Sequence, residues 1–190
     1  MKHRRPLSTL VLGAALLLPS LALLSACSSP SSDQVKTSME IVGLESKWVS
    51  REYKTWPHPK LVLVPSVTFR VKNLSDAPLT YVNFNALFRE ADAAKFNGDC
   101  YLAAIREKAV EPGALSDPIT MTSNLGVEGA SLASFKDQKL WKPWKVRLFA
   151  DTRGSRPVLL GDWDVSKTID FKEDTAPEAK KPPETKDAKK

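Results

Sequence analysis

Residues 67–88 read VTFRVKNLSDAPLTYVNFNALF, and this stretch decides the fold of the chain. Apolar and polar residues alternate on both sides of a polar segment, 73–78, whose Asn, Ser, Asp and Pro are typical of a turn. Strict alternation is typical of a strand that buries one face. The sequence therefore predicts two half-buried strands joined as an antiparallel hairpin. The residues expected in the core are Val67, Phe69, Val71, Val82, Phe84 and Phe88.

The same pattern recurs near the C-terminus. Residues 145–150 alternate, with Val146 and Leu148 on the side that is expected to be buried, and a polar turn follows. The chain returns over 157–165, where the alternation changes phase at Gly161. A change of phase at a glycine is typical of a β-bulge, so we expect a second hairpin with one bulged strand.

The segments between these hairpins add shorter elements. Residues 41–44 and 48–53 predict an opening strand with an interruption, and 119–122 predict a short strand. Residues 101–107 fit either a strand or a helix, and their composition favours a helix by propensity alone. One short helix is expected within 131–138, whose first serine can cap it. Together these elements predict a mostly β protein, an immunoglobulin-like antiparallel β-sandwich with one or two short helices.

Part of this region resembles a known family. Residues 69–79, followed by Tyr81 and Val82, resemble the opening of small bacterial immunoglobulin-like domains of the FxLYD type. In those domains a strand, an Asn-x-Ser turn and a second strand precede a Pro-Gly turn, and Glu111-Pro112-Gly113 fits that last feature. Residues 89–99 are longer than the tight turn that is usual there. The resemblance implies an extracytoplasmic β-sandwich and no particular activity.

The beginning of the chain has the layout of a secretory signal peptide, with basic residues, an apolar run over 7–24 and then small residues. Pro19 and several polar positions interrupt the run, which argues against a membrane span of ~20 apolar residues. The run closes with Leu24-Ser25-Ala26-Cys27, which resembles the lipobox of bacterial lipoproteins. The resemblance implies that residues 1–26 are removed as a lipoprotein signal peptide. It also implies that Cys27 becomes the lipidated first residue of the mature chain.

The residue after the lipobox bears on location. In enterobacterial lipoproteins an aspartate at that position favours the inner membrane, so Ser28 implies the outer membrane, facing the periplasm, with the inner membrane as the alternative. Each buried methylene adds about 0.8 kcal/mol, so two or more acyl chains hold a protein stably. A membrane, reached through the lipid, is therefore one expected partner.

The mature chain is expected to have three parts. Residues 27–38 are the lipidated cysteine and a polar segment without periodicity, which we interpret as a flexible tether. Residues 39–171 are the β-sandwich domain. Residues 172–190 hold six basic and five acidic residues and no large apolar residue after Lys172, so we expect a disordered charged tail.

The chemistry of the mature chain excludes several classes of function. Three of the 28 Lys and Arg residues lie in 1–26, which leaves a net charge of +3, too small and too scattered for nucleic-acid binding. One histidine, His58, and one free cysteine, Cys100, cannot supply the three or four ligands of a zinc site, so no metal or other cofactor is expected. A Cys100–His58 nucleophile pair is conceivable, but nothing near either residue activates it. We therefore assign no catalytic residues and expect Cys100 to be partly shielded.

Two further polar motifs have structural interpretations. Asn73-Leu74-Ser75 matches a glycosylation sequon, but in a bacterial lipoprotein we interpret it as a turn. Asp162 and Asp164 alternate on a predicted strand and are expected to lie on a solvated face rather than to bind calcium.

Two segments, 54–60 and 140–145, each combine Trp, Pro and Lys. Rigid loops that present aromatic side chains are typical of interfaces and sugar sites. The alternative, which the small size of the core favours, is that the tryptophans cap the core while the lysines stay in solvent. The candidate partner-binding residues are Trp56, His58, Trp141 and Trp144.

These observations predict a lipid-anchored, non-enzymatic binding or scaffolding module of the cell envelope, whose partner is an envelope protein or glycan. One alternative is a structural tether, because the ending Ala188-Lys189-Lys190 resembles envelope lipoproteins whose terminal lysine is linked to peptidoglycan. The helical heptads of those proteins are missing here. The other alternative, a small hydrolase, is disfavoured by the missing catalytic constellation.

Overall fold

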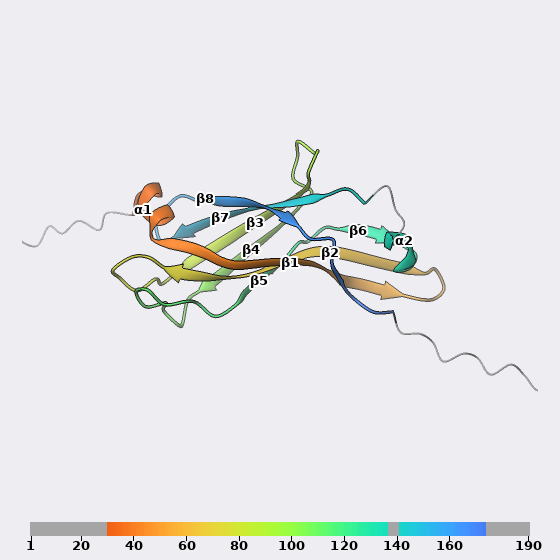
Figure 1. Cartoon of the computed structure of the whole chain (residues 1–190), viewed down its shortest axis with the longest axis horizontal. Helices are drawn as coiled ribbons and strands as arrows, with labels where there is room; N and C mark the ends of the chain where they lie inside the picture. The colour runs from red at the N-terminus through yellow and green to blue at the C-terminus, as the bar shows by residue number, and fades with distance from the viewer. Residues whose placement is uncertain (1–29, 137–140, 174–190) are drawn as a thin grey trace, which may run out of the picture.

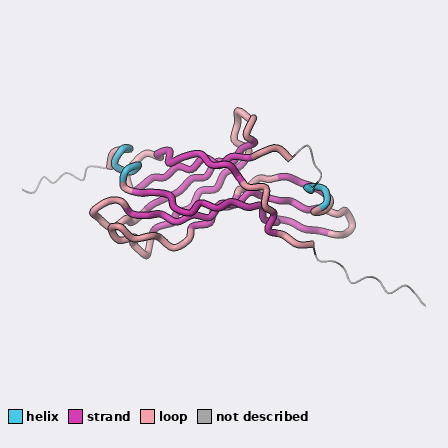
Figure 2. Tube along the Cα trace, viewed as in Figure 1, coloured by secondary structure: helices cyan, strands magenta, loops and turns pink. Residues whose placement is uncertain are grey.

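The chain folds into two β-sheets that face each other across one core (Figures 1 and 2), in a computed structural model that describes residues 30–136 and 141–173. The first sheet has the strand order β5-β2-β1-β9, and β6 also pairs with β2. The second sheet has the order β4-β3-β7-β8. The strands are β1 (Met39–Lys54), β2 (Lys60–Asn73), β3 (Val82–Glu90), β4 (Gly98–Ile105), β5 (Ile119–Thr122), β6 (Val127–Gly129), β7 (Trp144–Thr152), β8 (Val158–Val165) and β9 (Ile169–Asp170). The predicted β-sandwich is confirmed.

The core lies between the two sheets and is built from the alternating apolar residues. The rings of Phe69 on β2 and Phe84 on β3 meet edge to face, with centroids 5.2 Å apart, and so join the two sheets. Such pairs add specific geometry to the burial of large rings. The residues predicted to be buried are all buried, namely Val67, Phe69, Val71, Val82, Phe84, Phe88, Val146 and Leu148.

The pairing of the central stretch differs from the prediction. Residues 67–73 and 82–88 do not form one hairpin, because β2 belongs to the first sheet and β3 to the second. Asn73 lies where the chain crosses, is fully buried, and donates hydrogen bonds from Nδ2 to the carbonyl oxygens of Ala77 and Val110, each at 2.8 Å. The backbone N–H of Ser75 donates to Oδ1 of Asn73 at 2.9 Å, and this local bond shows that the Asn73 motif is a turn, as predicted. Alternation showed which face is buried, but it does not determine which strand is the partner.

The hairpin of the first sheet is instead formed by β1 and β2. The interruption expected between 44 and 48 is not found, because residues 45–47 are paired with β2 and β1 is continuous; the register shifts instead between Val42 and Glu45, where Gly43 has a φ of 61°, and again between Ser50 and Glu52. The left-handed conformation at Gly43 favours glycine. The β1–β2 hairpin continues beyond the second sheet along the long axis of the molecule (Figure 1), so that its tip, residues 55–59, lies at one end of the sandwich.

The second sheet confirms one prediction and corrects another. Strands β7 and β8 form the expected antiparallel hairpin, with a register shift next to Gly161. Residues 101–107 are largely strand rather than helix, since β4 pairs with β3 over its length. Its alternate residues Cys100 and Leu102 pack against the core, and this tertiary gain outweighs the helix propensity of the sequence.

The segment before the first strand is not a flexible tether over its whole length. Residues Ser32–Thr37 form a helix, α1, that begins with a capping box between Ser31 and Gln34. Val35 on this helix is only 1% exposed and belongs to the core. One buried side chain and a well-formed cap therefore fix the segment to the domain.

A second short helix, α2 (Ala133–Lys136), confirms the helix expected within 131–138 as far as the described residues reach. Cys27 and residues 174–190 lie outside the described part of the chain, and so do the signal peptide and most of the predicted tail. Within the described part, no helix is both long and apolar enough to cross a membrane.

Candidate binding surfaces

The tip of the β1–β2 hairpin carries the first pair of candidate residues. All five residues of the loop 55–59 are exposed, and the Trp56 side chain is 83% exposed. His58 lies in the same loop, between Pro57 and Pro59. A large aromatic ring without burial contributes nothing to the core, so it is available to contact a partner.

Ion pairs at the base of the tip hold the two strand ends together. Lys54 and Lys60 face each other across the hairpin, and their Nζ atoms lie 2.6 Å and 3.1 Å from the carboxylate of Glu52. Hydrogen bonds from Lys54 and then Lys60 lower the pKa of Glu52 below its usual range. Lys60 also lies 3.5 Å from Glu128 on β6. Ion pairs between β1, β2 and β6 therefore hold together the base of the loop that carries Trp56.

Trp141 and Trp144 have the opposite environment. They are 9% and 3% exposed, and their ring centroids lie 5.2 Å and 5.3 Å from that of the buried Trp48. Phe135 of α2 stacks edge to face on Trp141 at 5.7 Å. The hypothesis that these two tryptophans present themselves to a partner is therefore corrected, and the alternative of core caps holds for both.

The outer face of the second sheet is a further candidate surface. Tyr101 on β4, Asn85 on β3, Phe149 on β7 and Leu159 on β8 are register neighbours across the four strands. Tyr101 and Leu159 are exposed. The row therefore exposes aromatic and aliphatic surface on the outer face of this sheet.

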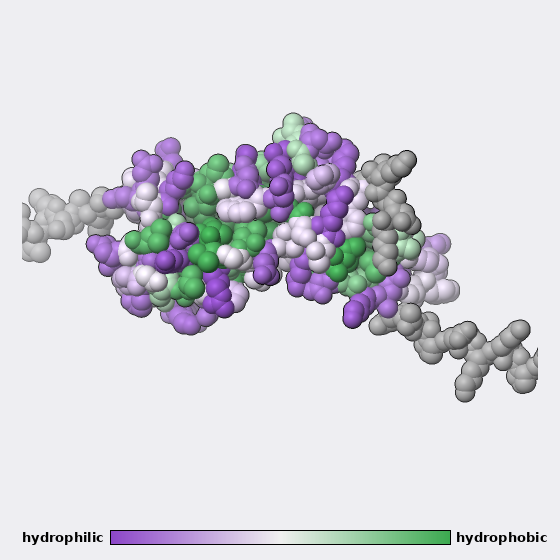
Figure 3. All heavy atoms as spheres, viewed as in Figure 1, coloured by the Kyte–Doolittle hydropathy of each residue, from purple (hydrophilic) through white to green (hydrophobic). Residues whose placement is uncertain are grey.

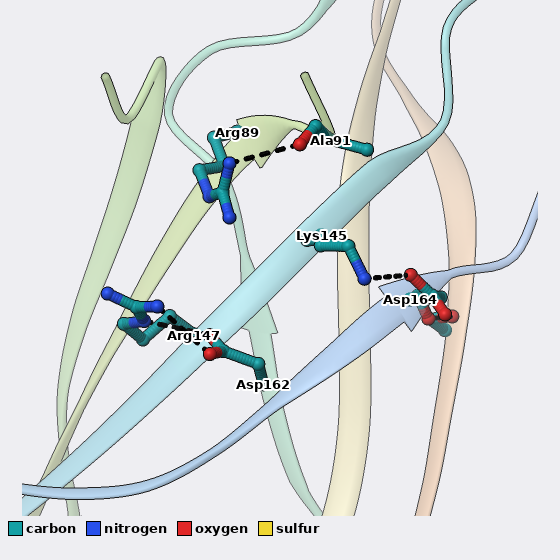
Figure 4. A network of polar contacts seen from close by, with 7 residues as sticks. Arg89, Ala91, Lys145, Arg147, Asp162 and Asp164 are labelled. Carbon is teal, nitrogen blue, oxygen red and sulfur yellow. Dashed lines mark hydrogen bonds and ion pairs between the residues drawn. The ribbon is translucent and has the colours of Figure 1, made fainter. Parts of the chain in front are cut away.

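Charged side chains next to this row neutralise one another (Figure 4). Arg147 binds Asp162 through two parallel hydrogen bonds, Nε to Oδ1 at 2.8 Å and Nη2 to Oδ2 at 2.9 Å. This bond from Arg147 lowers the pKa of Asp162. Lys145 lies 2.7 Å from Asp164, and Arg89 donates to the carbonyl of Ala91 at 3.1 Å. The two aspartates thus lie on a solvated face, as predicted.

The seam between the two sheets is apolar but protected. Figure 3 shows apolar surface gathered between the β1 and β8 edges, with hydrophilic residues around it. The open edges of this seam are β8 and the part of β1 that β9 does not cover, since β9 pairs only with Trp48 and Val49. Bulges and charges on such edges discourage the addition of another strand, and Gly43, Glu45, Gly161 and Asp162 provide them here. The partly buried residues of these edges that pack on the core are Ile41, Leu44, Leu160 and Trp163.

The residues considered for catalysis are not brought together. His58 lies at the tip of the first sheet, whereas Cys100 is half-buried on β4 of the second sheet. Among the described residues, no group of three or more His, Cys, Asp or Glu side chains could hold a metal ion.

Sequence reasoning missed a cluster at the α1 end of the sandwich. Tyr81 is 45% exposed, and the guanidinium carbons of Arg106 and Arg153 lie 5.5 Å and 5.7 Å from its ring centroid. Arg106 also donates a hydrogen bond to Oδ1 of Asn83. Tyr81 directly precedes β3, whereas Arg106 and Arg153 directly follow β4 and β7, and no sequence pattern links positions so far apart.

Comparisons with known proteins give only distant similarities. No family model matches the chain, and no curated protein matches it. A β-glucuronidase from glycoside hydrolase family 2 is 9% identical with a TM-score of 0.37, over 63% of this chain and 10% of that one. A protein solved as a structural-genomics target is 7% identical with a TM-score of 0.42, over 76% and 99%. The ligand binding region of Serine-glutamate repeat protein A of Enterococcus faecium is 12% identical with a TM-score of 0.26, over 66% and 96%. The chain spans a tenth of the glucuronidase, and similarity this distant carries no functional argument.

Proposed function

We propose that this chain is a lipid-anchored, periplasm-facing lipoprotein of the outer membrane that binds another envelope component without catalysing a reaction. The anchor is the lipidated Cys27, and the binding element is the hairpin tip with Trp56 and His58. The partner is an envelope protein or glycan.

One observation carries this proposal. Trp56 is 83% exposed at the tip of the β1–β2 hairpin, while α1, which follows the anchor by only a few residues, lies at the opposite end of the long axis (Figure 1). A lipid at one end and an exposed aromatic loop at the other suit a module that presents its loop away from the membrane. Loops at the ends of sandwiches are where this architecture commonly places recognition.

The anchor is tested by Cys27→Ser with Cys100→Ser as the matched control. We expect Cys27→Ser to accumulate as an uncleaved, unlipidated precursor, because the thiol that receives the lipid is missing. Cys100→Ser should be processed and lipidated like the wild type. Mass spectrometry of the mature N-terminus measures both, and a wild type that is cleaved without a lipid would contradict the anchor.

The binding element is tested by photo-crosslinking in whole cells. A crosslinking amino acid replaces Trp56 in one variant and Tyr101 in the other, since Tyr101 is also an exposed aromatic residue but lies on the outer face of the second sheet. We expect a discrete adduct from position 56 and none from position 101. An adduct from position 101 alone would transfer the binding surface to the sheet face.

A second candidate function has one observation in its favour. The described chain leaves the domain close to the tip, because Phe171 stacks on Tyr53 at 5.1 Å and β9 pairs with β1. The Lys-rich end therefore starts at the end of the domain that is opposite α1, the direction in which a structural tether to peptidoglycan would extend (Figure 1). Mass spectrometry of purified peptidoglycan for an adduct on Lys190 tests this candidate.

A further inference from the structure

The α1 end of the sandwich, defined here as α1 with Leu74, Tyr81, Arg106 and Arg153, is held close to the site of the anchor. Val35 fixes α1 to the core, and the backbone N–H of Leu74 donates to the carbonyl oxygen of Ser38 at 2.8 Å. Three residue steps separate Cys27 from Pro30, which borders the groove between α1 and residues 74–80. Three steps of chain reach at most roughly 11 Å. A lipid on Cys27 would therefore start within that distance of Pro30 at this end of the domain.

The exposed chemistry of the α1 end matches a bilayer surface. Leu74 and Tyr81 are 51% and 45% exposed, although both are apolar over most of their area. Tyr81 has a φ of 57°, a left-handed conformation that non-glycine residues rarely adopt, and the guanidinium carbons of Arg106 and Arg153 lie 5.5 Å and 5.7 Å from its ring centroid. Tyrosine is enriched at the level of lipid headgroups, and guanidinium groups bind phosphate through paired hydrogen bonds.

From the short connection and this chemistry together, we propose that the α1 end is a membrane-contact surface. Leu74 and Tyr81 lie in the headgroup layer, and Arg106 and Arg153 bind lipid phosphates. The inference rests on the proposed function, because it needs the lipid on Cys27. The inference adds that the domain is not held away from the bilayer by a flexible tether, but contacts the bilayer with one defined end.

The mixed charge of the α1 end limits how strongly it binds a membrane. Asp33 on α1 and Asp76 in the adjacent loop are also exposed, so the surface is mixed rather than polybasic. Such a surface does not recruit a protein to a membrane by itself. Next to an anchor its local concentration at the lipid is high, and weak contacts are then sufficient to set orientation. The outcome is that the hairpin tip points away from the membrane.

The test uses the full-length lipoprotein, purified from membranes with Cys100→Ala and reconstituted into vesicles of phosphatidylethanolamine and phosphatidylglycerol. Leu74→Cys and, as the matched control, Trp56→Cys each carry an environment-sensitive fluorophore. Both positions are exposed, so the label itself does not disturb the core. We expect iodide in the buffer to quench the label at position 74 several-fold less than the label at position 56. Lipids brominated near the headgroup should quench the label at position 74 alone.

A second pair of variants isolates the role of the arginines. Arg106→Gln with Arg153→Gln should restore iodide quenching at position 74 by roughly twofold, since two contacts to lipid phosphate are lost. Lys95→Gln with Lys167→Gln removes the same charge from exposed sites outside the α1 end and should leave quenching unchanged.

The outcomes separate this inference from the proposed function. Vesicle-bound protein with equal iodide quenching at positions 74 and 56 would overturn the contact surface and leave the anchor intact. Protein without a lipid, which does not float with vesicles, would overturn both. Protection of position 74 that persists in lipid-free buffer, together with crosslinked dimers, would show that a second copy covers this end and would also overturn the inference.

Discussion

The segments around Trp56 and around Trp141 and Trp144 have the same composition and opposite environments. Each combines tryptophan, proline and lysine, yet Trp56 is in solvent while the other two lie in the core against Trp48. The two segments differ in burial because only the segment around Trp141 and Trp144 is covered by the opposite sheet. The tip of the β1–β2 hairpin extends beyond the second sheet (Figure 1), whereas Trp144 begins β7 within the second sheet, and its ring lies against Trp48 of the first sheet.

The comparison teaches that composition identifies a segment worth testing but does not say whether its aromatic residues are buried. The lysines, in contrast, behave alike in both segments. Lys54 and Lys60 pair with Glu52, and Lys142 lies 3.1–3.2 Å from Asp92 and Glu90. The charged residues thus stay at the surface in both segments, and only the aromatic rings discriminate between them.

The largest effect is expected from Trp144→Ala. The ring is almost completely buried and contacts Trp48 edge to face, so its removal should lower the free energy of unfolding by about 3–5 kcal/mol. Denaturant unfolding of the unlipidated chain, followed by circular dichroism, measures the change. A loss below about 1 kcal/mol would place Trp144 at the surface and remove the contrast with Trp56.

A moderate effect is expected from Gly129→Ala, next to the buried cluster. A Cβ on Gly129 would lie 2.8 Å from Cζ of Phe135 and 2.9 Å from Cβ of Ser134, so α2 has to move. Overpacking of this kind costs typically 1–3 kcal/mol. Thermal unfolding measures this loss of stability. Gly113→Ala is not a suitable control, because Gly113 has a φ of 74° and an alanine there would strain the backbone. A neutral Gly129→Ala would show that Phe135 does not depend on this close approach.

Near-zero loss of stability with loss of binding is expected for Trp56→Ala. The ring buries little area, so the free energy of unfolding should stay within about 0.5 kcal/mol of the wild type. The yield of the envelope adduct formed through a crosslinker at His58 should fall. Retained adduct with lower stability would reverse the assignment and make Trp56 a structural residue.

The sequence predicted the buried faces better than the connections. Alternation depends on residues two apart, so the local sequence is sufficient to place Val67, Phe84 and Leu148 in the core. Pairing depends on distant partners, and nothing in residues 73–81 shows that the chain crosses to the other sheet. The bond from Asn73 to Val110 that fixes the crossing spans 37 positions.

The candidate binding residues show the same contrast between local and long-range information. The exposed tip was identified because prolines and a tryptophan are close in sequence, whereas the cluster of Tyr81 with two arginines is assembled from three loops and has no local signal. Helix α1 did have one, since Ser31 and Gln34 form a capping box and Val35 is a lone apolar residue in polar surroundings. A polar composition alone was therefore not sufficient to predict a tether.

The smallest effect is expected from Glu52→Gln, which removes the acceptor that Lys54 and Lys60 share at the base of the tip. These groups are exposed, so solvent and salt screen the ion pairs, and the melting temperature at neutral pH should fall only slightly. The hydrogen bonds lower the pKa of Glu52, so its contribution is present above the unfolded carboxyl pKa of roughly 4.3. That contribution disappears as the pH falls through the lower folded pKa, and wild type and variant should then melt alike. Melting curves at pH 7 and in acid, with and without added salt, measure this convergence. A difference that persists in acid would mean that Glu52 supports the tip through packing, and the lysines around Trp56 would then differ from those around Trp144.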